Sequence, residues 1–313
     1  MIARVQEAPA AEQVLQKHGK SFYWASRLLG ERHADRAARL YAFCRFADDV
    51  VDERPQSAAS DLALLRHRWS YRSGDDAELA RFRALADALH LDHDAIDCFL
   101  DALERDTGPV RVEDDADLLR YCYGVAGTVG VQMCAALDVS ESQALPFAID
   151  LGIGMQLTNI SRDVLEDAGR DRIYLPRTRV GRRATPERIA SGDPVSRRRA
   201  ERTIRQLLAL ADRYYRSADR GMRYLPWRAR LGIMTAARVY EAIGPVILRA
   251  LDEDRYWGAR AHVPARAKLR HTARATASLL FHPRYGNYGA HPRHDATLHE
   301  ALRGLPGADD GTR

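Results

Sequence analysis

The spacing of the apolar residues constrains the fold of this chain more than any other feature. Leucine, alanine, valine and isoleucine recur every three or four residues along most of its length, and alternating Val/Ile/Thr runs with tight turns are missing. That period is typical of amphipathic α-helices. The sequence therefore predicts an all-α protein, with helices near residues 12–29, 33–53, 60–72, 76–90, 93–106, 115–137, 141–168, 197–224, 228–251 and 264–281.

No change of composition divides this array of helices into separate domains. We expect one domain over residues 1–313, a helical bundle around a central cavity, with a core from about 15 to 282 and flexible termini. Two segments are predicted to be irregular: residues 169–196, which combine prolines with many arginines, and the Gly-, Pro- and His-rich tail after Phe281. The first of these segments is either a lid over a site or a plain connector, and the sequence leaves both open.

A modest excess of positive charge limits the partners that the chain favours. Its 313 residues carry a net charge of +5, and 46% of them are hydrophobic, as in ordinary globular proteins. Such a surface suits anionic ligands, although surface arginines more often serve solvation alone. Nucleic acid is not an expected partner, because arginine clusters by themselves support it only weakly.

Targeting signals are also missing from the sequence. The N-terminal residues MIARVQEAPAAEQ lack the apolar region of a signal peptide, and no stretch approaches the roughly 20 apolar residues of a membrane span. The four cysteines are widely separated, which favours reduced core positions. We therefore expect a cytoplasmic protein.

The first acidic motif, YAFCRFADDVVDE, ends the second predicted helix. Tyr41, Arg45, Asp48 and Asp52 stand at i, i+4, i+7 and i+11 and therefore share one helical face. The rest of this helix is largely apolar, so its carboxylates should face an internal cavity. A bound cation would offset the cost of burying them.

The second acidic motif, MQLTNISRDVLED, repeats this spacing closely. Gln156, Asn159, Asp163 and Asp167 stand at i, i+3, i+7 and i+11, again on one face. The preceding segment is apolar and contains two glycines, which either permit close helix packing or leave room for a ligand. The motif is followed by polar residues, as expected where a helix emerges at the mouth of a cavity.

Two such ladders of carboxylate and amide oxygens suit Mg²⁺, with Mn²⁺ as the alternative ion. Diphosphate is the natural bridging ligand, and further cationic contacts are available from Lys20, Arg45, Arg162 and Arg172. Surface acidic clusters paired with arginines are the less favoured alternative, because both ladders lie in apolar helices. A di-iron site is disfavoured because neither ladder contains Glu-x-x-His, and a phosphate-binding glycine-rich loop is absent.

Several segments together resemble the squalene/phytoene synthase family, in order and spacing: GKSFYWASRLL, YAFCRFADDVVDE, YCYGVAGTVG, QLTNISRDVLEDAGRDRIYLP and ARVYEAIG. The resemblance runs from about His18 to Leu269. It implies the isoprenoid synthase fold and the head-to-head condensation of two prenyl diphosphates through a cyclopropyl diphosphate intermediate. Asp171 departs from the family pattern, in which glycine is common before Arg172.

The resemblance also implies roles for individual residues. The ligands of the Mg²⁺-diphosphate group would be Asp48, Asp52, Asn159, Asp163 and Asp167. Aromatic rings can stabilise an allylic cation without attacking it, which favours Phe22, Tyr41 and Tyr121 near the reacting carbons. The expected catalytic residues are therefore Tyr41, Arg45, Tyr121, Gln156 and Tyr240, and the expected substrate-binding residues are Lys20, Ser21, Phe22, Arg45, Arg162 and Arg172.

The length of the prenyl chain should depend on the depth of an apolar tunnel. Ala34 and Ala38 lie seven and three residues before Tyr41, and their small size predicts room for the C20 tails of geranylgeranyl diphosphate, giving phytoene. A C30 synthase that uses farnesyl diphosphate to form dehydrosqualene, presqualene diphosphate or squalene remains the alternative, followed by a terpene cyclase or a non-catalytic relative. NADPH is not expected, but its use stays open. Lipid substrates also favour weak peripheral contact with the inner membrane.

Overall fold

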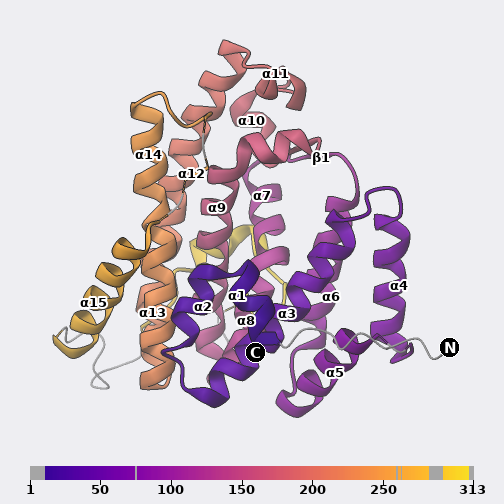
Figure 1. Cartoon of the computed structure of the whole chain (residues 1–313), viewed down its shortest axis with the longest axis vertical. Coiled ribbons are helices and arrows are strands. Elements are labelled where there is room, and N and C mark those ends of the chain that lie inside the picture. Colours follow the sequence, from indigo (N-terminus) through magenta and orange to yellow (C-terminus); the bar gives the residue numbers. More distant parts are fainter. Residues whose placement is uncertain (1–10, 75, 259, 262, 282–291, 310–313) are drawn as a thin grey trace.

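The computed structural model describes residues 11–74, 76–258, 260, 261, 263–281 and 292–309. Most residues in this part of the chain belong to helices, which confirms the all-α class (Figure 1). Residues 1–10 and 310–313, which were expected to be flexible, lie outside the described residues.

The helices of the first third of the chain lie close to their predicted positions, except that the first predicted helix is divided at Gly19. Asp76 and Asp92 precede two of these helices as N-caps, and their carboxylates accept backbone N–H groups of the first turn. These helices are α1 (Ala11–His18), α2 (Lys20–Ser26), α3 (Glu31–Asp52), α4 (Ala58–Tyr71), α5 (Ala77–Leu89) and α6 (His93–Glu104).

The longest helices of the second half cross the middle of the bundle. Helix α9 packs along α12 and is also covered by α8 (Figure 1). Asp193 and Pro194 begin α12 as N-cap and first helical residue, a combination that favours a helix start. The helices of this half are α7 (Asp115–Cys122), α8 (Thr128–Ala136), α9 (Leu145–Gly169), α12 (Pro194–Gly221), α13 (Trp227–Glu241), α14 (Ile243–Asp252) and α15 (Ala265–Phe281).

Glycines allow α9 to approach its neighbours very closely. A Cβ atom on Gly152 would lie 2.3 Å from the carbonyl oxygen of Ala126, and one on Gly130 would lie 2.4 Å from that of Ala148. Ala126 belongs to a π-helical turn, Tyr123–Gly127, that joins α7 to α8. The glycine-rich segment therefore combines close helix packing with a local distortion of the helix.

The segment between α9 and α12 is more ordered than its composition predicts. Its strand β2 (Arg172–Ile173) pairs in parallel with β1 (Val110–Arg111). Two short helices follow, α10 (Arg177–Val180) and α11 (Pro186–Ala190), and they pack on α12 and on α9 respectively. The proposed lid function of this segment stays a prediction.

The last described segment, residues 292–309, packs on the bundle although the sequence placed it beyond the core. Its 3₁₀ turns, Ala296–Leu302, bury Leu298 and Leu302 in the main apolar core. The hydroxyl of Tyr214 on α12 donates a hydrogen bond of 2.8 Å to the carbonyl oxygen of Leu298. This segment therefore covers one side of the central helices.

One helical stretch of the described chain, Trp227–Asp252, is long and apolar enough to cross a membrane, whereas the sequence was expected to contain none. It comprises α13 and α14, and its mean hydropathy over the most apolar window is 1.4. Half of that window is buried inside the bundle. Core helices share this property, so the stretch is only weak support for a membrane span.

Candidate active site

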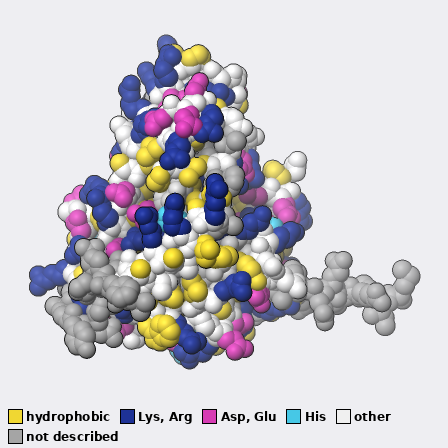
Figure 2. Space-filling view, turned by 60° about the vertical axis from the view of Figure 1, so that its left-hand side comes forward, with side chains coloured by type: hydrophobic (Ala, Val, Ile, Leu, Met, Phe, Trp, Pro, Cys, Tyr) yellow, Lys and Arg dark blue, Asp and Glu magenta, His cyan; other side chains and the backbone are white. Residues whose placement is uncertain are grey.

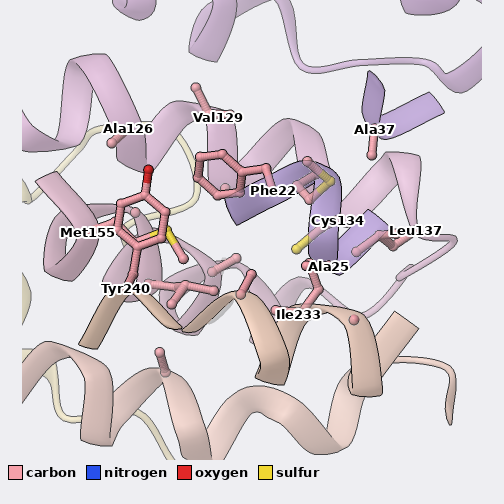
Figure 3. A pocket seen from close by; sticks show the side chains of 18 of the residues that line it. Phe22, Ala25, Ala37, Ala126, Val129, Cys134, Leu137, Met155, Ile233 and Tyr240 are labelled. Carbon is pink, nitrogen blue, oxygen red and sulfur yellow. The ribbon is translucent and has the colours of Figure 1, made fainter. Parts of the chain in front are cut away.

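A cavity of about 380 Å³ lies between α2, α3, α8, α9 and α13. Most of its lining is apolar, and Figure 3 shows Tyr240 and Met155 at one end of it and Ala37 and Leu137 at the other. Polar side chains enter it from two helices, Asp48 from α3 and Asn159 from α9. Volume and lining are those of a site for a largely apolar small molecule with one polar end.

Helix α3 turns a slightly different face to the cavity from the one predicted. Tyr41 and Asp48 line it as expected, but Ala37 and Cys44 stand beside them. Ala34 and Ala38, the predicted continuation of the tunnel, are absent from the lining. The correction has a simple cause: the cavity follows positions i−4, i, i+3 and i+7 from Tyr41, which is the opposite drift from the i−3 and i−7 row.

Arg45 contacts a neighbouring carboxylate on its own helix. Its guanidinium forms an ion pair with Asp49, one turn later on α3. Asp49 directly follows Asp48 and therefore points about 100° away from it around the helix. Arg45 still acts on Asp48, because its positive charge lowers the pKa of that carboxyl.

Asp48 is the most strongly perturbed group on α3. Burial, together with the negative charges of Asp52 and Asp106, raises the pKa of its carboxyl to about 7, against the lowering effect of Arg45. An ordinary aspartate has a pKa near 3.9. The chain thus supplies less positive charge at this position than the ionised carboxylate requires.

Asp52 joins α3 to the segment that follows α9. Arg170 donates to one of its oxygens at 2.8 Å and Arg172 to the other at 2.9 Å. Asp171, directly before Arg172, has a left-handed backbone with a φ of 59°. This turn of the backbone sets the direction in which the Arg172 side chain leaves the chain. That conformation favours glycine, the residue that the family resemblance led us to expect at this position.

On α9, the first two members of the second ladder lie inside the cavity. Gln156 and Asn159 both line it, and the Asn159 amide donates to the Gln156 side-chain oxygen at 3.2 Å. The Oδ1 atom of Asn159 is buried and has no hydrogen-bond partner among the described residues. A buried acceptor of this kind is costly unless a ligand satisfies it.

Asp163 is held by two arginines. Arg162 and Arg260 each donate to its carboxylate twice, with Nε to Oδ1 distances of 2.8 Å for both. Burial alone would raise the pKa of Asp163, but these hydrogen bonds keep it below its usual range. Arg260 is the less buried partner, with 56% of its side chain exposed, and sequence reasoning assigned it no role because the stretch around it lacks a clear motif.

Asp167, one turn further along α9, resembles Asp48 rather than Asp163. Burial, with the charges of Asp163 and Glu166, raises its pKa to about 8. Arg172 lowers this pKa only in part. The two ladders therefore contribute one carboxylate each that lacks adequate compensation.

A further carboxylate, which the sequence did not reveal, lies between the ladders. Asp106, in the turn after α6, is buried and acts electrostatically on Asp48, Asp52 and Asp167. Burial raises its pKa, although two tyrosine hydroxyls donate to it. The only sequence signal was a single aspartate before the Gly108–Pro109 break, which no periodic pattern would select.

Tyr121 belongs to the surroundings of Asp106. Its hydroxyl donates to Asp106 at 2.8 Å, and that of Tyr174 donates to the other oxygen at 2.7 Å. The two rings stack with centroids 4.7 Å apart. Tyr121 is not among the residues that line the cavity, so its ring is less directly placed than predicted.

Aromatic rings do meet inside the cavity near its polar end. Phe22 on α2 stacks on Tyr240 of α13 with a centroid distance of 5.0 Å, and it lies 6.0 Å from the ring of Tyr41. Lys20 and Ser21, two residues earlier on the same helix, do not line the cavity. Lys20 is exposed; burial and, to a smaller extent, the charge of Lys20 lower the pKa of Lys268.

The oxygen atoms of the two ladders are of the kind that a hard divalent cation binds. Asp48 and Asn159 line the cavity, whereas Asp52, Asp163 and Asp167 do not. The unpartnered Asn159 Oδ1 and the raised pKa values of Asp48 and Asp167 each indicate missing positive charge. Carboxylate and amide oxygens are the ligands that Mg²⁺ prefers, and a diphosphate would complete its shell. The residues present therefore suit the ion that the sequence predicted.

Comparisons with known proteins agree with this geometry. The family profile described as squalene/phytoene synthase matches residues 15–267. The chain is 31% identical to a phytoene synthase of Rhodobacter capsulatus over 99% of both chains, and 35% identical to a 15-cis-phytoene synthase of Enterobacter agglomerans over 74% of this chain and 82% of that one. A presqualene diphosphate synthase of Rhodopseudomonas palustris is 34% identical over 59% of this chain and 69% of that one.

Solved structures show the same fold. A dehydrosqualene synthase crystal structure covers 86% of this chain and 95% of its own, with a TM-score of 0.72 and 23% identity. The relatives together support head-to-head condensation of prenyl diphosphates as the reaction class. The chain therefore belongs to the squalene/phytoene synthase family of prenyltransferase-type enzymes.

Proposed function

We propose that this enzyme condenses two molecules of geranylgeranyl diphosphate head to head into phytoene through a cyclopropyl diphosphate intermediate. The observation that carries the proposal is an apolar cavity between the two ladder helices, into which Asp48 and Asn159 enter at one end. The cavity would hold the prenyl tails, and the carboxylates would face the diphosphates. Relatives named phytoene synthase, at 31 to 35% identity, support the C20 substrate.

Asp48, Asp52, Asn159, Asp163 and Asp167 would hold Mg²⁺. When bound, this ion would draw negative charge from the diphosphate and make it a better leaving group. Mn²⁺ has the same preference for oxygen ligands and is the alternative.

The arginines of the site would complete the binding of the diphosphate. Arg162 and Arg260 hold Asp163 in place, and Arg172 joins Asp52 to the carbonyl oxygen of Asp106 at 2.6 Å. Each guanidinium has donors beyond those used for its carboxylate. Some of these can turn to phosphate oxygens without releasing the aspartate.

The apolar part of the cavity would protect a carbocation from water. Phe22, Tyr41 and Tyr240 present aromatic rings next to the polar end, where the allylic cation would form. The ring faces stabilise positive charge by their quadrupole, with about 0.5–2 kcal/mol from each contact. The hydroxyls of Tyr41 and Tyr240 stay neutral, because burial raises their pKa values.

A product assay tests both the reaction and the chain length. The purified enzyme is incubated with Mg²⁺ and either farnesyl or geranylgeranyl diphosphate, with and without NADPH, and the hydrocarbon is identified by mass. We expect a C40 product from the C20 substrate that does not depend on NADPH. Preference for the C15 substrate would favour the C30 alternative, which the presqualene diphosphate synthase relative supports. Lack of diphosphate release from both would overturn the condensation itself and favour a non-catalytic role.

The depth of the cavity can be tested at Ala37. This side chain is 7% exposed and lies at the far end of the cavity in Figure 3. Ala37→Phe should shorten the cavity and move the preference of the enzyme from C20 toward C15 by about tenfold, the value of one or two methylene contacts. Ala63 is an exposed residue of α4, so Ala63→Phe is the matched control and should leave the preference unchanged.

Weak peripheral contact with the inner membrane from the cytoplasmic side is part of the proposal. Trp227 is 64% exposed, and the guanidinium of Arg228 lies 5.3 Å from its ring centroid. Leu269 on α15 is 60% exposed. On the face that Figure 2 turns forward, Lys and Arg side chains lie beside apolar ones, with some acidic side chains among them. Exposed apolar and basic side chains together favour anionic lipid surfaces. Flotation with anionic liposomes should recover the protein, and Trp227→Ser should weaken recovery; no recovery of the wild type would contradict the contact.

A further inference from the structure

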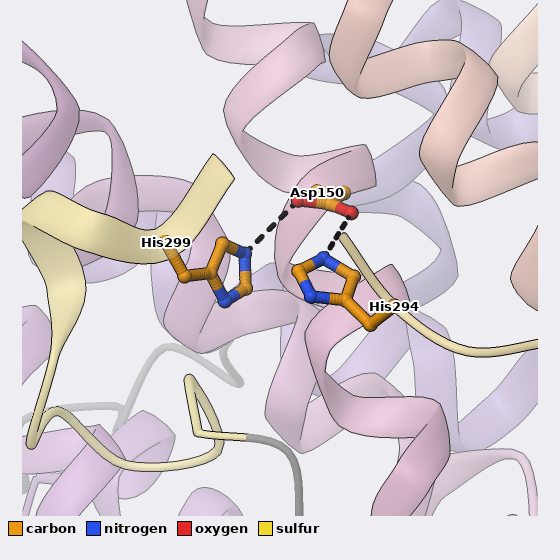
Figure 4. Close-up of side chains that lie close together, drawn as sticks. All are labelled: Asp150, His294 and His299. Atoms are coloured by element: carbon orange, nitrogen blue, oxygen red, sulfur yellow. Dashed lines mark hydrogen bonds and ion pairs between the residues drawn. The ribbon is translucent and has the colours of Figure 1, made fainter. Parts of the chain in front are cut away.

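A second cluster of ligating side chains lies on α9, away from the acidic ladders. Asp150 is fully buried, and two imidazoles of the C-terminal segment reach it, one at each carboxylate oxygen (Figure 4). The Nε2 atom of His294 lies 2.8 Å from Oδ2, and that of His299 lies 3.0 Å from Oδ1. Asp150 and Asp163 are about 20 Å apart at the rise of an α-helix, so the cluster is separate from the active site.

The hydrogen bonds of His299 show which ring nitrogen carries the proton. Its Nδ1 atom lies 2.8 Å from the carbonyl oxygen of Ala308, which only accepts hydrogen bonds, so Nδ1 donates. In a neutral ring, Nε2 then presents its lone pair to the Asp150 carboxylate, which also only accepts. Two acceptors 3.0 Å apart require positive charge between them, either a second proton on the ring or a metal cation.

The donor set favours the metal cation. The ligating atoms of Asp150, His294 and His299 all lie within 4.8 Å of one another, and their side chains are 0, 2 and 4% exposed. Histidine ligands of metals characteristically donate the other ring N–H to a carbonyl oxygen, as His299 does. Zinc with bonds of about 2.0–2.1 Å holds neighbouring ligand atoms about 3 Å apart, close to the spacing seen here.

We propose that Asp150, His294 and His299 bind a zinc-type divalent cation that fastens the C-terminal segment to α9. Imidazole nitrogens favour zinc over magnesium, so this site and the all-oxygen ladders would select different ions. The ring of His294 also packs edge-on against Phe147, with centroids 5.2 Å apart, and Phe147 lines the cavity. A metal at this site would therefore stabilise the part of the cavity wall that contains Phe147.

The test counts metal on the full-length enzyme. The protein is stripped with a chelator, dialysed against Zn²⁺ with an excess of Mg²⁺ to occupy the ladders, and analysed by inductively coupled plasma mass spectrometry. We expect about one zinc per chain, and in a parallel sample with Co²⁺ the visible bands of a four-coordinate site with nitrogen ligands. Absence of retained zinc in the wild type would overturn the proposal and leave a protonated His299 as the source of the charge.

Variants identify the ligands. His294→Gln and His299→Gln should each lose the zinc and the cobalt bands, whereas His67→Gln, an exposed histidine on α4, should retain both. Asp163→Asn should also retain the zinc, because it alters only the ladders. Zinc that persists in both ligand variants, or that disappears in Asp163→Asn, would contradict this site. Zinc should raise the melting temperature of the wild type and of His67→Gln but not that of His294→Gln. Because each protein is compared with and without zinc, an effect of the substitution on folding does not change the conclusion.

Discussion

Helix α9 carries two aspartates whose pKa values are shifted in opposite directions, Asp150, which is fully buried, and Asp167, which is partly exposed. At Asp150, burial would raise the pKa, but the two histidines more than offset it and the pKa is below its usual range. At Asp167, burial and the neighbouring carboxylates raise the pKa to about 8. The helix and the residue type are the same, so the difference comes from the partners.

This contrast distinguishes a carboxylate that links two parts of the fold, together with the proposed zinc, from ladder carboxylates that would bind the Mg²⁺-diphosphate group. Asp150 is contacted by two histidines from a distant segment of the chain, His294 and His299. Asp167 and Asp48 are surrounded by other carboxylates and only partly compensated by Arg172 and Arg45. Under-compensated buried charge is costly and is therefore typical of functional sites. The comparison predicts that substitutions at the ladder aspartates should change catalysis, whereas substitution of Asp150 should change stability.

The largest effect is expected at the ladders. Asp48→Asn and Asp163→Asn should each lower the rate of diphosphate release by at least about 100-fold, because each removes negative charge aimed at the cation. Circular dichroism should show unchanged helical content. Asp35→Asn, an exposed site on the same helix as Asp48, is the control and should keep full activity. Retained turnover in both ladder variants would contradict the metal assignment.

At the other end of α9 the expected effect is on stability. Asp150→Asn leaves two buried imidazoles without their carboxylate and should lower the free energy of unfolding by about 3 kcal/mol. Chemical denaturation measures the loss. The Mg²⁺ concentration for half-maximal activity should not change in this variant. A large change in that Mg²⁺ concentration without loss of stability would contradict the structural role assigned to Asp150.

Asp106 should have a smaller effect on catalysis. It does not line the cavity, but its charge adds to the field of Asp48, Asp52 and Asp167. Asp106→Asn should raise the Mg²⁺ concentration for half-maximal activity about tenfold, as for other residues behind metal ligands. Asp94→Asn, exposed on α6, is the control. Unchanged Mg²⁺ dependence would make Asp106 purely structural.

The smallest effect concerns pH. Asp48 and Asp167 bind protons more tightly in the folded chain, so their contribution to stability is complete below about pH 4 and is lost as pH rises through about 7 and 8. The metal-free protein should therefore become less stable over this range. Mg²⁺ binds the ionised form, and it should raise the melting temperature by more at about pH 8.5 than at about pH 6. Equal shifts at both pH values would contradict the raised pKa values.

Most of the helical architecture could be predicted from local periodicity. The helices α3, α9 and α12 lie within a few residues of their predicted bounds, because the nearest seven or eight residues determine an amphipathic face. The helix predicted at 228–251 is divided into α13 and α14. The ladder aspartates were found in the same way. The rotation of α3 toward Ala37 could not be found, because it depends on how α3 meets α2 and α8.

What the sequence by itself determined was thus the all-α class, the positions of the helices and the two acidic faces on α3 and α9. Only the tertiary structure decided which residues from distant segments meet these faces: Asp106 between the ladders, Arg260 on Asp163, and His294 and His299 on Asp150. The physical reason is separation along the chain. Helix periodicity is a local property, whereas a buried charge and its partner meet only when the whole bundle packs. A single histidine or aspartate in an irregular segment belongs to no periodic pattern, so the sequence alone does not predict its partner.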